Sequence, residues 1–167
     1  MADEHPSAIV IGTDLSPIQP SWVPPNCRFY VDDAETEWEF EHKFQYIHGR
    51  ALCGAIADWP KFYAEAFKNL EPGGWLEMQE HESWVKSEDR TVEDAVWTNE
   101  WNEELDRASL IFGKRWNVAE EHVKWIRDAG FEEVREIVHK VVLADQSPWI
   151  METLVAHNEF VRANCCI

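Results

Sequence analysis

The chain has 167 residues, of which 45% are hydrophobic, so it can form one domain with a substantial core but not two ordinary ones. Its 15 Lys and Arg residues stand against 32 Asp and Glu residues, which gives a formal charge of −17. Such a charge repels phosphate backbones and anionic lipid headgroups. From the length we expect a single domain over residues 1–167. From the charge we expect no nucleic-acid or membrane partner.

Targeting and disulfide signals are absent from the sequence. No run of about 18 apolar residues occurs, and residues 1–6 contain no basic stretch ahead of an apolar one. Cys27, Cys53, Cys165 and Cys166 have neither the spacing of a metal knuckle nor that of a dense disulfide framework. We expect a soluble, cytoplasmic protein with reduced thiols, a nuclear location being the alternative.

Short apolar runs rich in β-branched and aromatic residues predict the strands of the first half. These runs cover residues 8–13, 27–31, 44–48 and 75–79. The first three end on polar residues. Because ligands of a parallel α/β sheet bind outside the carboxyl ends of its strands, these polar residues are the first candidates for a site.

Apolar residues at helical spacing predict the helices. A helix over residues 51–70, with Pro60 able to break or restart it, precedes the turn at residues 71–74. A capping box at residues 91–94 and a cap at residues 117–120 start two more. Residues 134–143 alternate as a strand does, and residues 149–161 predict a last helix. The pattern predicts an α/β fold, with a mainly parallel sheet covered by helices on both faces.

The ten tryptophans are unusual in a chain of this length. Each carries a large apolar surface that favours burial, so most are expected in the core. Any excess would line a pocket or a subunit contact. Trp97 and Trp101 lie one turn apart on the helix that follows the capping box, and we expect them to be core residues, with an aromatic clamp on a substrate as the alternative.

Five segments, in this order and spacing, resemble the fungal S-adenosylmethionine-dependent methyltransferases related to regulators of secondary metabolism. They are IGTDLSPIQP, FYVDDAETEWEF, YIHGRALCGAIADWP, FKNLEPGGWLEMQE and IRDAGFEEVRE. The resemblance implies an incomplete class I methyltransferase sheet, Rossmann-like, that lacks the first and last family strands. In that family a Gly-x-Gly-x-Gly turn after the first strand lets the cofactor approach the backbone. The seven glycines of this chain include no Gly-x-Gly pair.

A missing first strand would leave unpaired backbone groups on its two neighbours in the sheet. The neighbours could pair with each other, the N-terminal residues could fill the gap, or a second chain could donate a strand. We expect a homo- or hetero-oligomer, because an incomplete sheet and surplus tryptophan both favour one.

The resemblance implies roles for residues at the ends of the first two strands. Asp14 matches the acid that accepts hydrogen bonds from the ribose hydroxyls, and Asp33 with Ala34 matches the pair that meets the adenine edge. An ionised carboxylate has the acceptor sites for the first role. The alternative is structural: Asp14 would cap the turn at Ser16, and Asp33 would be one more solvated acid.

Further candidates lie at the third and fourth strands. His48 could transfer a proton near neutral pH, and Arg50 could bind a carboxylate; a structural histidine and a surface ion pair are the alternatives. Glu80 and His81 are further catalytic candidates, and His81 could form an acid–base pair with a distant carboxylate. Because alternate residues of a strand point oppositely, Glu80 and Glu82 share a side that His81 does not, so no metal site is expected from this run alone.

Three functions are consistent with the sequence. The first is a methyltransferase-like protein that binds no cofactor by itself and uses its pocket to bind, cyclise or rearrange a small apolar metabolite, where holding a reactive geometry supplies much of the acceleration. The second is an S-adenosylmethionine-dependent methyltransferase completed by a partner chain. The third is a non-enzymatic accessory or regulatory subunit whose acidic surface docks a basic partner.

Overall fold

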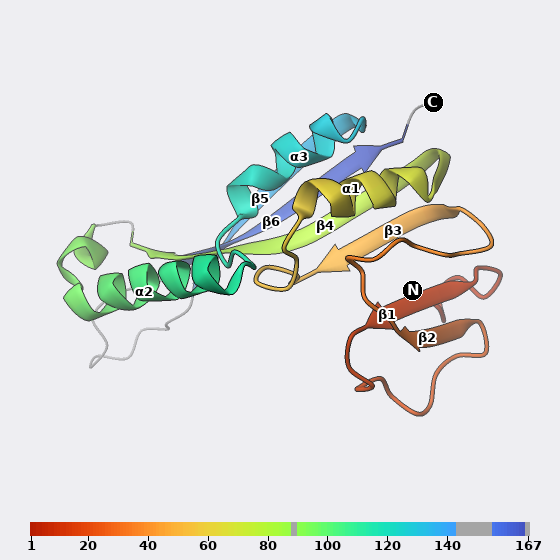
Figure 1. Cartoon of the computed structure of the whole chain (residues 1–167), viewed down its shortest axis with the longest axis horizontal. Helices are drawn as coiled ribbons and strands as arrows, with labels where there is room; N and C mark the ends of the chain where they lie inside the picture. Colours follow the sequence, from red (N-terminus) through yellow and green to blue (C-terminus); the bar gives the residue numbers. More distant parts are fainter. Residues whose placement is uncertain (88–89, 143–154, 166–167) are drawn as a thin grey trace. The chain divides into compact units, whose positions relative to one another are not determined.

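A computed structural model describes residues 1–87, 90–142 and 155–165 (Figure 1). The chain forms two compact units, Met1–Trp38 and Glu39–Ile167. No helix in the described part of the chain is long and apolar enough to cross a membrane. Cys27, Cys53 and Cys165 are free thiols, as expected; Cys166 lies outside the described residues.

The first unit contains two parallel strands, β1 (Val10–Asp14) and β2 (Cys27–Val31). Their register pairs Val10 with Cys27 and Asp14 with Val31, so the two strands end side by side. A proline-rich segment, residues 15–26, is the loop that joins them.

Asn26 fixes the N-terminal turn of this unit. Its side-chain amide donates hydrogen bonds to the backbone oxygens of Ala2, Ala8 and His5, at 3.1, 2.9 and 3.0 Å. The amide shares its two N–H donors among these three carbonyl oxygens, and thereby holds the start of the chain against the start of β2.

The second unit contains a four-stranded mixed sheet in the order β3-β4-β6-β5 (Figure 1). Its strands are β3 (Phe44–Arg50), β4 (Leu70–Lys86), β5 (Glu132–Val142) and β6 (Val155–Asn164). β3 is parallel to β4, whereas β6 is antiparallel to both of its neighbours. Parallel pairing, predicted for the strands of the first half of the chain, is confirmed between β1 and β2 and between β3 and β4, and the α/β class holds for the whole.

The described residues of this unit form three α-helices: α1 (Trp59–Lys68), α2 (Val96–Phe112) and α3 (His122–Asp128). Short 3₁₀ turns precede α2 and α3, at Thr91–Asp94 and Ala119–Glu121. In Figure 1, α1 and α3 lie next to each other on one face of the sheet. On the opposite face, β3 exposes Tyr46, His48 and Arg50.

Helix α1 begins eight residues later than the apolar spacing predicts, at Trp59 rather than Ala51. The Asp58 carboxylate accepts a hydrogen bond from the backbone N–H of Lys61 at 3.0 Å, and Pro60 occupies the first turn. Both are preferred helix-start residues, because the first turn has N–H groups without helical partners. Local capping chemistry therefore sets this boundary.

The core lies between the sheet and helices α1 and α3. Tyr63, Leu70, Leu76, Ile126 and Ala163 have no solvent-exposed surface. An aromatic cluster extends this core between the two helices. It consists of Trp59, Phe62, Tyr63, His122 and Trp125, whose rings contact one another.

Two predictions about the second half are wrong. Where residues 149–161 predicted a helix, residues 155–161 belong to strand β6, because β4 and β5 pair with this segment from both sides; residues 149–154 lie outside the described residues. The predicted capping box at Thr91 does not start the long helix, since α2 begins at Val96.

Candidate functional site

Two acidic residues come together where β1 and β2 end. Asp14 is the last residue of β1, and its backbone oxygen accepts a hydrogen bond from the N–H of Asp32 at 3.0 Å. Asp33, the next residue, is half-buried, whereas Asp14 is exposed. The parallel register therefore brings Asp14 and Asp33 to the same edge of this small sheet, as the strand-end pattern predicts.

Both carboxylates also stabilise local turns. Asp14 Oδ1 accepts the N–H of Ser16 at 2.8 Å, and Asp33 Oδ1 accepts the N–H of Glu35 at 2.9 Å. These are the side-chain-to-backbone bonds that aspartate makes two residues onward in a turn. The Ala34 carbonyl accepts the indole N–H of Trp38 at 3.0 Å. Turn formation and ligand binding are compatible here, since a carboxylate has about four acceptor sites.

On β3, His48 and Arg50 share one exposed face of the strand. The strand extends to Arg50, so His48 lies two residues before its end rather than at it. His48 Nδ1 is 3.5 Å from Glu77 Oε1 on β4. The Tyr46 ring stacks against the His48 imidazole, with ring centroids 6.3 Å apart. His48 is thus held by a carboxylate and a ring on the open face of the sheet.

The strand predicted over residues 75–79 would leave Glu80 and His81 just beyond its end. In the structure, both residues lie inside strand β4. β4 continues to Lys86 because β6 pairs with it beyond Gln79, matching Glu80 with Glu159 and Glu82 with His157. Glu80 and Glu82 are buried, at 2% and 4% exposure. β3 ends at Arg50, which pairs with Gln79, so β4 has no β3 partner beyond Gln79. Glu80, His81 and Glu82 lie in this part of β4.

Glu80 organises the turn that follows β3. Its two carboxylate oxygens accept the backbone N–H groups of Leu52 and Cys53, at 2.9 and 3.1 Å. Ala51, directly before them, has a positive φ of 53°, which is costly for a residue with a Cβ. The two carboxylate bonds stabilise this turn. Burial raises the pKa of Glu80, and the two backbone bonds oppose that shift.

Cys53 and His81 meet at the same place. Cys53 Sγ lies 3.5 Å from His81 Nε2, and the nearest donor atoms of Cys53, Glu80 and His81 all lie within 4.8 Å of one another. Burial, and next the charge of Glu80, raise the pKa of the Cys53 thiol to about 12. The sequence offered no spacing signal for this cluster, because Cys53 precedes Glu80 by 27 residues.

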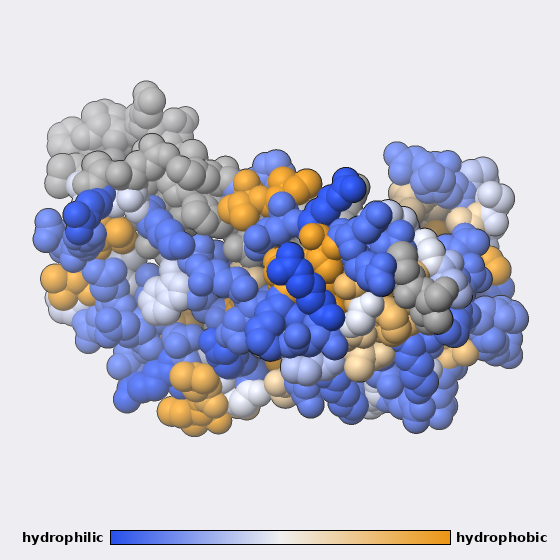
Figure 2. All heavy atoms as spheres, turned by 90° about the horizontal axis from the view of Figure 1, so that it is seen from above, coloured by the Kyte–Doolittle hydropathy of each residue, from blue (hydrophilic) through white to orange (hydrophobic). Residues whose placement is uncertain are grey.

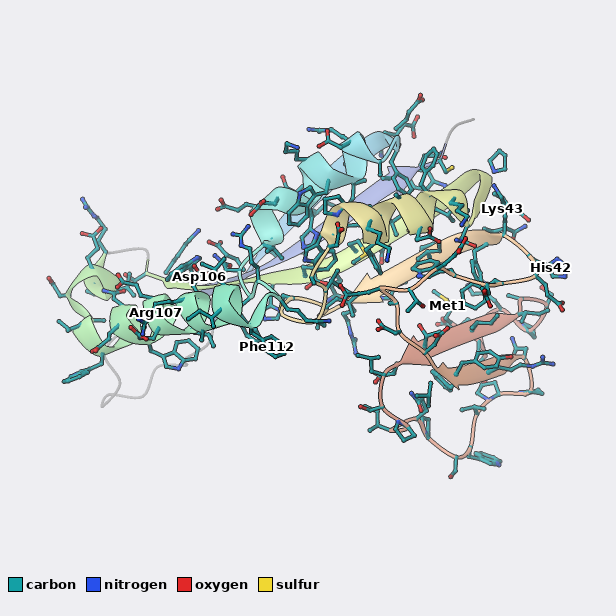
Figure 3. The ribbon with its side chains drawn as sticks, viewed as in Figure 1. Met1, His42, Lys43, Asp106, Arg107 and Phe112 are labelled. Carbon is teal, nitrogen blue, oxygen red and sulfur yellow. The ribbon has the colours of Figure 1, made fainter. Side chains whose placement is uncertain are left out.

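Trp97 and Trp101 are exposed, at 82% and 57%, so their predicted place in the core is wrong. The only buried residue of α2 is Asn102. A cavity of about 10 Å³ lies beside it, enough for about one water molecule. Its lining consists of Trp84, Asn102, Leu105, Asp106, Trp116 and Asn117; Figure 3 labels Asp106 on α2. Neither Trp97 nor Trp101 lines this cavity.

Other apolar side chains of α2 also reach the surface. Leu110, Ile111 and Phe112 are 54%, 82% and 75% exposed at the C-terminal end of the helix, where Figure 3 labels Phe112. Figure 2 shows apolar patches of this kind within a mostly hydrophilic surface. The helix has an apolar stripe, as its sequence predicts, but only part of that stripe packs against the unit.

Comparison with known proteins identifies the family. Residues 1–136 match the model of the methyltransferase domain. The chain is 39% identical over 142 residues to methyltransferase pytC of Aspergillus terreus, covering 84% of this chain and 44% of that protein. It is 34% identical over 152 residues to the protein-methionine methyltransferase laeA of Emericella nidulans, covering 89% and 40%. The chain thus spans less than half the length of these fungal relatives.

Solved structures agree on the fold. A phosphoethanolamine N-methyltransferase from Haemonchus contortus, solved with S-adenosylmethionine, aligns with a TM-score of 0.58 at 17% identity, over 99% of this chain and 46% of that one. A SAM-dependent methyltransferase from Methanosarcina mazei aligns with a TM-score of 0.57 at 14% identity, over 95% and 82%. The resemblance seen in the sequence is confirmed, and the chain belongs to the methyltransferase-domain family, with fungal secondary-metabolism proteins among its relatives.

Proposed function

We propose that this chain supplies the ribose and adenine side of an S-adenosylmethionine-dependent methyltransferase site, and that a glycine-rich strand from further polypeptide completes it. The observation that carries the proposal is the meeting of Asp14 and Asp33 at the adjoining ends of two parallel strands. When bound, S-adenosylmethionine would supply a sulfonium methyl group for transfer to a nucleophilic atom of the substrate.

The local turns give the two acids fixed directions. The Ser16 N–H holds Asp14 Oδ1, so its carboxylate is oriented before any ligand arrives and can accept the ribose hydroxyls. The Glu35 N–H holds Asp33 in the same way, beside Ala34, where the adenine edge would bind. Orientation of this kind reduces the entropy lost on binding.

Two strand edges support completion by another polypeptide. β1 pairs with β2 alone, and β3 pairs with β4 alone, within the residues that the structure describes. Each strand therefore has one edge at which a further strand could bind through backbone hydrogen bonds. An oligomer, of this chain or with a different one, is the corresponding proposal for its partners.

A second candidate function rests on the absence of a Gly-x-Gly pair from the sequence. On this hypothesis the chain binds a small apolar metabolite, without a cofactor, and promotes its cyclisation or rearrangement by holding a reactive conformation. It differs from the first proposal in one measurable respect: a glycine-rich segment added in trans would not create an S-adenosylmethionine site.

The test is titration calorimetry with S-adenosylhomocysteine. We expect no micromolar binding by the chain alone, and binding once a polypeptide that carries the Gly-x-Gly-x-Gly segment typical of the family is added. Asp14→Ala should weaken that binding by about 10- to 100-fold, since hydrogen bonds to charged groups contribute about 1.5–3 kcal/mol. The exposed Asp3 provides the matched control, and Asp3→Ala should change nothing.

Two results would overturn the first proposal. One is the absence of binding with the added region present, which favours the cofactor-free function. The other is binding that Asp14→Ala and Asp33→Ala both leave unchanged, which shows that the strand-end acids do not hold the nucleoside.

A further inference from the structure

We propose that Cys53, Glu80 and His81 form a zinc site with three protein ligands and one position open to water or a substrate atom. The three residues offer a sulfur, a carboxylate oxygen and an imidazole nitrogen, all within 4.8 Å of one another. Thiolate, imidazole and carboxylate are the donor types that zinc binds in proteins, and three of them with an open fourth position are typical of catalytic zinc sites.

The spacing of the donors fits a tetrahedral ion. Zinc bonds of about 2.3 Å to sulfur and about 2.0–2.1 Å to nitrogen place those two atoms about 3.5 Å apart at the tetrahedral angle. The observed distance between Cys53 Sγ and His81 Nε2 is 3.5 Å. The two side chains therefore need little movement to share an ion.

The surrounding backbone holds the ligands in place. Glu80 accepts the N–H of Cys53, so one ligand is tied directly to the segment that carries another. Each carboxylate oxygen receives one backbone bond, and the second lone pair of an oxygen remains as a donor to a metal. Cys53 and Glu80 are buried, at 8% and 2% exposure, whereas His81 is half-buried and opens the cluster toward solvent.

Trp116 restrains the third ligand. Its ring packs edge-on against the His81 imidazole, with ring centroids 5.9 Å apart. Gly54, next to Cys53, has a φ of 72°, and a Cβ there would lie 2.9 Å from the Trp116 ring. A glycine thus lets the Cys53 segment approach the indole closely, and the indole in turn orients the imidazole.

Zinc binding would change the protonation of the cluster. Cysteine binds zinc as a thiolate, so its proton must leave when the metal binds. On binding, the S–H bond breaks, the sulfur donates its electron pair to zinc, and the proton leaves to solvent.

The experiment measures Zn²⁺ affinity of the full chain by competition with a chromophoric chelator, and coordination by Co²⁺ absorption. We expect one zinc per chain, a Co²⁺–thiolate charge-transfer band, and visible bands of tetrahedral intensity. Cys53→Ser and His81→Gln should each lower the affinity by more than about 100-fold, beyond the 10- to 100-fold typical of changes around the ligands. Cys27→Ser, at a free thiol in the other unit, should leave it unchanged.

The variants also guard against misfolding. His81→Gln changes a half-buried side chain, so circular dichroism should show an intact fold even where Cys53→Ser is destabilised. Absence of zinc binding by the folded wild-type chain would overturn the proposal, as would a Co²⁺–thiolate band that survives Cys53→Ser. The readout is metal binding, so the result is independent of whether the chain takes part in methyl transfer.

Discussion

Trp59→Ala is expected to lower the free energy of unfolding of the unit formed by residues 39–167 by about 3–5 kcal/mol, the usual cost of truncating a buried tryptophan. Trp59 is 3% exposed and stacks on Trp125 with ring centroids 6.1 Å apart, while the His122 ring meets its face edge-on at 4.5 Å. With Tyr63, it is one of the rings that α1 contributes to the contact with α3.

The loss would come from packing rather than from hydrogen bonding. The indole N–H of Trp59 is buried and has no partner among the described residues, so alanine removes no hydrogen bond at this position. What remains is the apolar transfer energy together with the cavity left between the two helices. Urea denaturation followed by far-ultraviolet circular dichroism measures the change without depending on the tryptophan fluorescence that the variant alters.

The same substitution on α2 provides the control. Trp97 is 82% exposed, so Trp97→Ala should change the free energy of unfolding by no more than about 0.5 kcal/mol. Equal losses at the two positions would contradict the burial described here, and would indicate that the α2 surface packs against something in solution.

The strands of the first half were predictable because their signals are local. An apolar run bounded by turn residues needs no distant partner to be recognised. The second predicted strand matches β2, at residues 27–31, and the first and third match β1 and β3 within two residues at each end. Asp14 and Asp33 were found for the same reason, since strand ends and turn chemistry are both visible in the sequence.

The errors concern features that distant parts of the chain decide. Apolar spacing identified a stripe on α2, but spacing does not show whether anything covers a stripe, and Trp97 is exposed. β6 forms because β4 and β5 pair with it, and β4 runs past Gln79 for the same reason. The Cys53–Glu80–His81 cluster depends on where a turn meets the edge of a strand, which no spacing along the chain encodes.

The pH dependence of stability should report the buried histidine of the aromatic core. Burial lowers the pKa of His122 to about 4, from its ordinary value of 6.5. Below pH 6.5 the unfolded chain takes up a proton at this position while the folded chain does not, so stability falls as the pH drops from about 6.5 to about 4. The shift corresponds to a loss of about 3 kcal/mol, at about 1.36 kcal/mol per pKa unit.

Carboxylates also titrate at the lower end of this pH range. A variant of His122 therefore isolates the part of the pH-dependent loss of stability that this histidine causes. The Tyr63 hydroxyl lies 2.6 Å from His122 Nδ1, and burial raises the pKa of Tyr63, so it stays protonated and can donate to the neutral ring. His122→Asn keeps an acceptor for Tyr63 but no titrating group. We expect it to be less stable than wild type at pH 7, with a shallower fall in stability between pH 6.5 and 5.

His42→Asn, at an exposed position (Figure 3), should leave the wild-type profile unchanged. Urea midpoints at closely spaced pH values give the comparison. An unaltered slope in His122→Asn would show that the imidazole of His122 is protonated in the folded state. In that case the Nε2–H group of His122 would have a hydrogen-bond acceptor in solution. In the described structure, Nε2 is buried without a partner.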